Sequence, residues 1–426
     1  MKKKVALMLI TALTMGLLGG CGSEEKKGDS GETASEKVEI EFWHCMGASN
    51  GELIQEMTDA FNESQDEIVV KAVHQGSYTD ASTKMQAALS AGEAPVVAQM
   101  EIGSLGVFAD AGQLVDLQPY VEEDEFDLDD FMPGLLDASY YNDELISLPH
   151  SRSLPVLYYN KDKFQAAGLD VNNPPQNWEE LKTAAAALTV DGTYGYSCPL
   201  DQWYYCSLMM NAGGSIYNED NTSIGFNNES GTAPLYLWKE MIDAGSMHVP
   251  SGQDYNSSEA CRNAFAGGTA AMIMQSSAQL KGLEKTCGFE VGVAAIPEDK
   301  TLSYPAGGSN LMMFQGHSEE EERAGWEFIK FMTNAENALK WANGTGYLPL
   351  RESCTELDEY KEMVAADPNL QIILDNVQYS AEATFIPEYA ETKEIIANEI
   401  QKCILEEDYS PEQAVQSIAD RVENLF

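Results

Sequence analysis

The chain has 426 residues, of which 44% are hydrophobic, and 69 acidic residues against 25 basic residues give a formal net charge of −44. Nucleic-acid binding requires cationic side chains, so this charge argues against a nucleic-acid partner. The length exceeds what a single ordinary core needs and predicts two lobes.

The first 37 residues have the pattern of an exported, anchored protein. Three lysines precede an apolar segment from Val5 to Leu18, which is typical of a signal peptide and shorter than the about 20 residues that span a membrane. The end of this segment, Leu18 to Cys21, resembles the lipobox of bacterial lipoproteins. We therefore predict a lipoprotein signal peptide (residues 1–20), lipidation of Cys21 and a disordered tether (residues 21–36). The protein would be exported and lipid-anchored at the extracellular face of the cell membrane; the alternative is an ordinary signal peptide with a chance cysteine.

Strands and helices alternate in the first part of the body. The pattern predicts strands at residues 38–45, 67–75 and 94–101, and amphipathic helices at 51–64 and 81–92. Such alternation is typical of an α/β fold with a parallel sheet covered on both faces. Ligands of these sheets bind beyond the carboxyl ends of the strands.

The second half continues in the same style. Strands are predicted at residues 269–277 and 289–297. Ser318 and Glu321 form a capping-box pattern that opens a helix, and Ser410 is placed to cap the final amphipathic helix.

Catalytic and metal-binding patterns are weak. Residues 47–51, "GASNG", fit the nucleophile-elbow pattern around Ser49, but they follow the first strand, so no earlier strand supplies a second oxyanion donor. The five histidines lack metal-ligand spacing, and no phosphate-binding loop or dinucleotide motif occurs. We expect that the protein is not an enzyme and that it holds no cofactor and no metal. The remote alternative is a hydrolase that uses Ser49.

Cysteine usage does not indicate a disulfide framework. Besides Cys21 the chain has an odd number of cysteines and no CxxC motif. We expect mostly free, buried thiols. If a disulfide forms, Cys198 and Cys206 are the expected pair.

Several stretches resemble the extracellular solute-binding proteins of family 1. They are "EFWHCMGASNGELIQEMTDAFN", "PVLYYNKDKFQAAGLDVNNPPQNWEELKTAA", "FAGGTAAMIMQSS", "GGSNLMMFQG" and "NGTGYLPLRE", in an order that holds across almost the whole mature chain. Within that family, "QGSYTD", "PVLYYNKD" and "TGYLP" are most similar to the members that bind glycerol 3-phosphate.

This resemblance implies a two-lobed, periplasmic-binding-protein-like fold (type II), with a ligand cleft between lobes joined by a hinge. We expect the first lobe at residues 37–152 and 306–350, and the second at 153–305 and 351–426. The implied function is that of a monomeric substrate-binding protein, which closes on a small molecule and delivers it to the permease of an ABC importer.

The resemblance also assigns cleft residues by position. Tyr78 and Tyr347 match family tyrosines, and Trp203 matches an aromatic residue that lies against the carbon face of the ligand. Ser153 matches a family serine in the first crossing. A carboxylate at Glu101 can accept hydroxyls of a polyol, and Ser276 and Gly308 are expected to donate hydrogen bonds. Structural explanations stay open: a surface turn for Tyr78, a solvated loop charge for Glu101, hinge packing for Ser153 and Gly308, a helix cap for Ser276 and core packing for Trp203.

Three positions depart from the glycerol-3-phosphate binders. Lys393 aligns with their phosphate-binding arginine, Leu200 replaces a tryptophan, and Arg152 stands where they have a small residue. Arg152 or Lys393 is expected to supply the cation for a phosphate. The smaller Leu200 leaves room for a larger ligand, so the prediction is glycerol 3-phosphate or a glycerophosphodiester, with a mono- or oligosaccharide as the alternative.

Overall fold

The computed structural model describes residues 37–132, 134–252, 255–381 and 386–426. The signal peptide, Cys21 and the tether that we predicted for residues 1–36 lie outside these ranges. Residues 37–426 form one compact unit, which is built around two five-stranded sheets.

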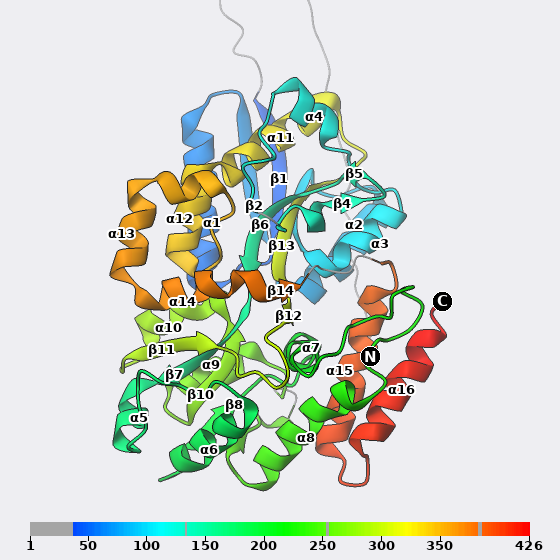
Figure 1. Cartoon of the computed structure of the whole chain (residues 1–426). Helices are drawn as coiled ribbons and strands as arrows, with labels where there is room; N and C mark the ends of the chain where they lie inside the picture. Colours follow the sequence, from blue (N-terminus) through cyan, green and yellow to red (C-terminus); the bar gives the residue numbers. More distant parts are fainter. Residues whose placement is uncertain (1–36, 133, 253–254, 382–385) are drawn as a thin grey trace, which may run out of the picture. The chain divides into compact units, whose positions relative to one another are not determined.

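The first sheet forms the centre of the first lobe, in the upper part of Figure 1. Its strand order is β2-β1-β3-β13-β6, with β1 (Val38–His44), β2 (Ile68–His74), β3 (Val97–Glu101), β6 (Leu148–Ser153) and β13 (Gly307–Met313). The second sheet has the order β11-β7-β10-β8-β9, with β7 (Pro155–Asn160), β8 (Tyr194–Ser197), β9 (Met247–His248), β10 (Ala270–Ser276) and β11 (Val291–Ala295).

Neither sheet is wholly parallel, which corrects our prediction. Strand β13 runs antiparallel to both β3 and β6, and β7 runs antiparallel to both β10 and β11. The reason is that β7 and β13 begin where the chain has just crossed from the other lobe. They therefore enter their sheets from the cleft side, whereas strands within a βαβ unit end there.

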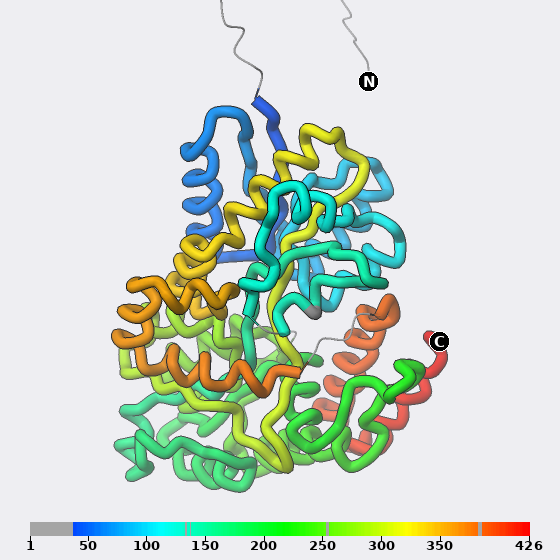
Figure 2. Tube along the Cα trace, turned by 45° about the horizontal axis from the view of Figure 1, so that its top comes forward, coloured from blue at the N-terminus to red at the C-terminus, as the bar shows by residue number. Residues whose placement is uncertain are grey.

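Two extended crossings join the lobes side by side (Figure 2). Only the fully buried Leu154 separates the end of β6 in the first sheet from the start of β7 in the second. The return crossing passes through β12 (Tyr304–Pro305), which pairs with β14 (Ser380–Ala381), and continues into β13. A short hairpin of β4 (Tyr140–Tyr141) and β5 (Glu144–Leu145) lies in the first lobe.

Helices cover both sheets (Figure 1). In the first lobe, α11 packs on β1, and α1 packs on β2 and α12. In the second lobe, α14 packs on β11 and α9 packs on β10. The bounds are α1 (Ala48–Ser64), α2 (Tyr78–Ala91), α3 (Leu105–Asp110), α4 (Gln118–Glu123), α5 (Lys161–Ala166), α6 (Trp178–Leu188), α7 (Gln202–Asn211), α8 (Glu229–Asp243), α9 (Ser258–Ala266), α10 (Leu280–Thr286), α11 (Glu319–Thr333), α12 (Ala335–Thr345), α13 (Asp358–Ala366), α14 (Pro368–Asn376), α15 (Tyr389–Leu405) and α16 (Pro411–Glu423).

Local capping explains several helix boundaries. Ser318 and Glu321 form the predicted capping box at α11, and Ser410 caps α16. Helix α2 begins three residues before the predicted start, because Ser77 and Asp80 form a further capping box there.

The lobe boundaries stay a prediction, and one contact bears on them. The Nη1 atom of Arg351 lies 3.1 Å from Oδ2 of Asp130, and its guanidinium lies over the rings of Phe126 and Phe131. Contacts of first-lobe residues therefore continue past the expected boundary at Leu350. All seven cysteines among the described residues are free, so Cys198 and Cys206 do not form a disulfide in the structure.

Candidate functional site

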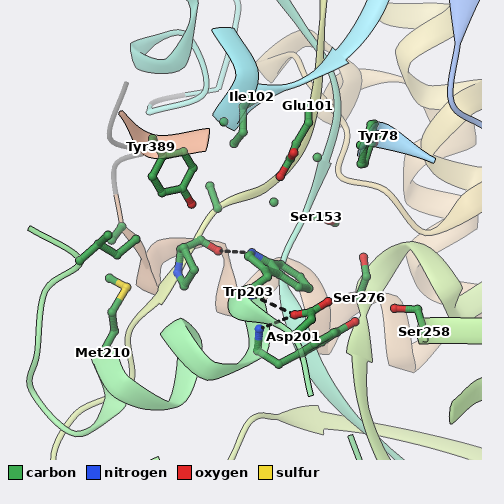
Figure 3. A pocket seen from close by; sticks show the side chains of 18 of the residues that line it. Tyr78, Glu101, Ile102, Ser153, Asp201, Trp203, Met210, Ser258, Ser276 and Tyr389 are labelled. Carbon is green, nitrogen blue, oxygen red and sulfur yellow. Dashed lines mark hydrogen bonds between the residues drawn. The ribbon is translucent and has the colours of Figure 1, made fainter. Parts of the chain in front are cut away.

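A cavity of about 810 Å³ lies between the two lobes. Its walls come from the end of β3, the start of α2, both crossings, the first turn of α7, the end of β10 and the start of α15. Seven of the nine expected ligand-binding residues line it: Tyr78, Glu101, Ser153, Trp203, Ser276, Gly308 and Tyr347. Figure 3 shows how the side chains converge on the cavity.

Where the chain crosses between the lobes, glycine main chain forms part of the cavity wall. Gly308 has a φ of +112°, and a Cβ atom there would lie 1.7 Å from the carbonyl oxygen of Ser151. Only glycine fits this position. Ser153 and Gly307, which face each other across β6 and β13, also line the cavity.

Two tyrosine hydroxyls lie at the first-lobe wall. The hydroxyl of Tyr78, the first residue of α2, is buried without a hydrogen-bond partner among the described residues. The hydroxyl of Tyr347 lies 3.8 Å from the Sδ atom of Met46, a weak acceptor, and close to the hydroxyl of Tyr78. Burial raises the pKa of Tyr78 well above its ordinary value and that of Tyr347 to about 12, so both are neutral donors at pH 7. Both tyrosines line the cavity, and neither hydroxyl has a strong acceptor in the described part of the protein.

Glu101 occupies the end of β3, as predicted for a ligand beyond the carboxyl ends of the strands. Its Oε2 atom lies 2.5 Å from Nζ of Lys393 in α15. Lys393 is not among the residues that line the cavity, so its charge is directed to Glu101. Direct contact between Lys393 and the ligand stays a prediction.

Arg152 does not line the cavity either. It is 2% exposed, is absent from the cavity wall, and donates from Nη2 to the carbonyl oxygen of Leu135 at 3.0 Å. Burial lowers the pKa of its guanidinium to about 10. Side chains alternate between the faces of a strand, so Ser153 faces the cavity and its neighbour Arg152 does not.

Trp203 stands near the middle of the cavity wall. Its Nε1 atom donates to the carbonyl oxygen of Pro305 at 3.2 Å, and its ring meets that of Tyr204 edge to face at 5.0 Å. A Cβ atom at Gly307 would lie 2.6 Å from the indole, so the ring packs on bare backbone. The indole is held in place with no ligand needed to orient it. Leu200, the departure from the family tryptophan, is fully buried and does not line the cavity.

Ser276 both lines the cavity and caps a short 3₁₀ helix, in which its hydroxyl accepts from the backbone N–H of Ala278 at 3.3 Å. The cap that we considered as the structural explanation is therefore present.

Asp201 is a cavity residue that the sequence did not reveal. It caps α7 by accepting from the backbone N–H groups of Trp203 (2.9 Å) and Tyr204 (3.2 Å) through Oδ1. Burial raises its pKa to about 7, although these two hydrogen bonds act in the opposite direction. The signal that could have found it is an acidic residue directly before an aromatic helix start. Further lining residues that we missed are Tyr204, Met210, Ile216, Tyr217, Ser258 and Tyr389.

Other sites considered in the sequence gain no support. Ser49 is exposed in the first turn of α1, and the described residues provide no histidine hydrogen-bonded to it. Within the same part of the chain, no cluster of three or more His, Cys, Asp or Glu residues is suited to hold a metal ion. Apart from the undescribed gaps, residues 37–426 contain no helix with the length and apolar content needed to cross a membrane.

Comparison with known proteins defines the class. The sequence profile of the bacterial extracellular solute-binding proteins matches residues 56–371. The chain belongs to this family and is a substrate-binding protein of an ABC importer.

Individual relatives refine the comparison. The sn-glycerol-3-phosphate-binding periplasmic protein UgpB of Yersinia pestis bv. Antiqua (strain Antiqua) is 29% identical over 354 residues, which cover 79% of each chain. UgpB of Mycobacterium tuberculosis in complex with glycerophosphocholine superimposes with a TM-score of 0.82 at 24% identity, over 91% of this chain and 98% of that one. The GacH receptor of Streptomyces glaucescens, solved unliganded and with acarbose, gives a TM-score of 0.82 at 23% identity, over 92% and 99%. These structures share the fold that we predicted.

Proposed function

We propose that the ligand of this substrate-binding protein is a glycerophosphodiester, which the two lobes enclose and deliver to the membrane permease. The observation that carries this proposal is a pair of neutral tyrosines, Tyr78 and Tyr347, which line the cavity and whose hydroxyls have no strong acceptor in the described part of the protein. Hydroxyl donors of this kind suit phosphate oxygens.

The charge of the cavity favours a diester over a monoester. The described residues that line it include two carboxylates, Glu101 and Asp201, and no lysine or arginine. A phosphate monoester carries almost two negative charges near pH 7, whereas a diester carries one. With the charge of Lys393 directed to Glu101, the single charge is the easier one to accommodate.

The other end of the ligand meets acceptors. Glu101 and Asp201 each keep one carboxylate oxygen for which the described residues offer no hydrogen-bond donor. Glycerol hydroxyls are the matching donors. The names of two relatives, one that binds sn-glycerol 3-phosphate and one solved with glycerophosphocholine, support the same chemical class.

A saccharide is the second candidate. The Trp203 indole offers a flat apolar face against which a sugar ring can pack. The carboxylates of the cavity wall can accept hydrogen bonds from sugar hydroxyls, and no lysine or arginine of the described wall competes for them. The GacH receptor, with the same fold, was solved with acarbose.

Calorimetry on the purified mature chain separates the candidates. We expect glycerophosphoglycerol and glycerophosphocholine to bind more tightly than glycerol 3-phosphate, and maltose to give no heat of binding. Tight binding of maltose with silence from every phosphodiester would replace the proposal by the saccharide alternative.

We also propose that Cys21 is lipidated and holds the protein at the extracellular face of the membrane. The Cys21→Ala variant should leave washed membranes and appear in the medium or as unprocessed precursor, with unchanged ligand affinity. Retention equal to that of the wild type would contradict the anchor.

A further inference from the structure

We propose that Asp201 binds the ligand as a neutral carboxylic acid, so that capture of an anionic ligand takes up a proton from the solvent. The proton forms a bond to Oδ2 of Asp201 and returns to the solvent when the ligand leaves. This inference rests on the proposed function, because an uncharged ligand would give Asp201 no electrostatic reason to gain a proton.

The two oxygens of the Asp201 carboxyl group have different surroundings. Oδ1 caps α7 and accepts from the backbone N–H groups of Trp203 at 2.9 Å and Tyr204 at 3.2 Å. Oδ2 has no hydrogen-bond donor among the described residues, and Asp201 lines the cavity. In Figure 3 the carboxyl group lies beneath Trp203, on the same side as Ser276. A proton on Oδ2 therefore leaves the helix cap intact and can be donated to a ligand atom.

The surroundings of Asp201 stabilise the neutral form. Burial raises its pKa to about 7 and Glu101 acts in the same direction, whereas the two cap hydrogen bonds and Lys393 act against them. About half of the empty molecules therefore carry this proton at pH 7. Four further groups near Asp201 have a pKa that burial raises, so they stay neutral between about pH 6 and 8: Cys198, Tyr204, Cys206 and Cys261.

A bound phosphodiester adds a negative charge to a wall whose described residues include two carboxylates and no lysine or arginine. A nearby like charge disfavours the carboxylate, so the pKa of Asp201 should rise further in the complex. By linkage, the proton and the anion then each strengthen the binding of the other. The affinity for the anion should rise as the pH falls toward about 7, the pKa of the empty protein, and should then level off.

The neutral carboxyl group suits the proposed ligand. A carboxylate repels a phosphate oxygen, whereas a carboxylic acid can donate a hydrogen bond to it. The protonated oxygen keeps acceptor capacity, so it can still accept from a glycerol hydroxyl. Together with the neutral tyrosines Tyr78 and Tyr347, Asp201 would give the cavity wall three O–H donors without a cation.

The test is titration calorimetry of the purified mature chain with glycerophosphoglycerol, at one pH in two buffers that differ in their heat of ionisation. The difference in heat between the buffers counts the protons taken up. Glycerophosphoglycerol keeps a single charge across the range, whereas glycerol 3-phosphate has a second pKa of about 6 and would itself titrate. We expect about half to one proton per ligand at pH 7.5, and binding about five- to tenfold tighter at pH 6 than at pH 8.

Variants assign the proton to Asp201. Asp201→Asn keeps an oxygen for the helix cap and places an N–H donor where the acid would carry its proton. It should bind glycerophosphoglycerol without proton uptake and with the same affinity at pH 6 and pH 8. All five histidines remain in this variant, so proton uptake by a histidine would persist. Asp367→Asn changes another aspartate that caps a helix, outside the cavity wall, and is the matched control. Should Asp201→Asn not fold, Asp201→Ser keeps the cap and removes the carboxyl group.

The outcomes separate this inference from the proposed function. If the diester binds without proton uptake, or if the uptake survives in Asp201→Asn, the role of Asp201 is overturned while the proposed function stands. Weaker binding of Asp201→Asn at both pH values would show that Asp201 acts as a charged acceptor, and it also overturns the inference. If no diester binds at either pH and a saccharide does, both proposals fail together.

Discussion

The Nζ atom of Lys393 lies 2.5 Å from Oε2 of Glu101, and this ion pair joins α15 to the end of β3 across 292 positions of sequence. Helix α15 packs on α7, α8 and α16 of the second lobe, whereas β3 belongs to the first sheet. The ion pair therefore links the lobes, and one of its members lines the cavity. A contact between the lobes and the charge at the cavity wall therefore depend on the same ion pair.

Lys393→Met should weaken binding of a glycerophosphodiester by about tenfold, since the unpaired Glu101 then repels the phosphate by on the order of 1–2 kcal/mol. Calorimetry at two salt concentrations measures the change, and added salt should reduce it. The double variant Glu101→Gln, Lys393→Met should bind more tightly than Lys393→Met alone. If Lys393→Met weakens ligand binding by the same factor in the wild-type chain and in the Glu101→Gln chain, Lys393 does not act through Glu101.

Gly103→Ala should disturb the approach of the lobes. A Cβ atom at Gly103 would lie 2.6 Å from Cε1 of Tyr389, so the ring must move and α15 with it. Small-angle scattering should show a larger radius of gyration with ligand present than for the wild type. Gly282→Ala is the matched control, because nothing lies within 4 Å of its added Cβ atom. Identical scattering of the two variants would contradict a role for Gly103 in closure.

Tyr78→Phe and Tyr347→Phe should each weaken binding of a glycerophosphodiester about ten- to hundredfold, since a hydrogen bond to a charged group contributes about 1.5–3 kcal/mol. Thermal stability should change little, because the Tyr78 hydroxyl has no protein partner among the described residues and that of Tyr347 has only a weak one. Titration calorimetry measures the affinity, and Tyr236→Phe, on a helix outside the cavity wall, is the control. Unchanged affinity in both cleft variants would remove the basis of the phosphate assignment.

Much of the fold could be predicted from the sequence, because it depends on local patterns. The alternation at residues 38–45 and the capping residue Ser318 both act within a few positions of the chain. The antiparallel direction of β7 and β13 could not be predicted from such local patterns. Strand direction depends on which lobe the chain has just left, and no residue within the strand encodes that.

The expected site residues that line the cavity are those whose position in a strand or turn determines the direction of the side chain. Glu101 ends a strand and Tyr78 starts a helix, so both lie at the cleft edge of a sheet. The two expected cations do not line the cavity, since Arg152 points away from it and Lys393 pairs with Glu101 on the other lobe. Asp201 was missed because a helix cap and a cavity residue have the same sequence pattern.

Acid should destabilise the protein through His150. Burial lowers the pKa of this histidine from 6.5 to about 3. The unfolded chain then binds the extra proton between these pH values, so stability is lost as pH falls through this window. Between pH 6.5 and 4.5 the wild type should lose about 2–3 kcal/mol of unfolding free energy more than His150→Gln, as measured by urea denaturation. Parallel pH profiles of the two proteins would contradict this assignment.

Arg351→Lys should destabilise the first lobe by about 2–4 kcal/mol, although the charge is kept. The guanidinium donates from Nε to the carbonyl oxygen of Thr333 at 2.6 Å and from Nη1 to Asp130, and a lysine ammonium cannot reproduce this geometry. Urea denaturation measures the loss. Arg421→Lys, in the more exposed ion pair with Glu399, should change stability by less than about 1 kcal/mol. Equal effects of the two substitutions would refute the special role of Arg351.

The position of β13 inside the first sheet determines when this protein can fold. Its residues 307–313 lie between β3 and β6, whose residues end at 101 and 153. A ribosome produces the other four strands of this sheet long before the strand that completes it, and loop closure over that distance is slow. The nascent chain therefore stays without a finished first sheet until almost three quarters of its 426 residues have been made. For an exported protein this delay is useful, because an unfolded chain is the form that a narrow translocation channel can pass.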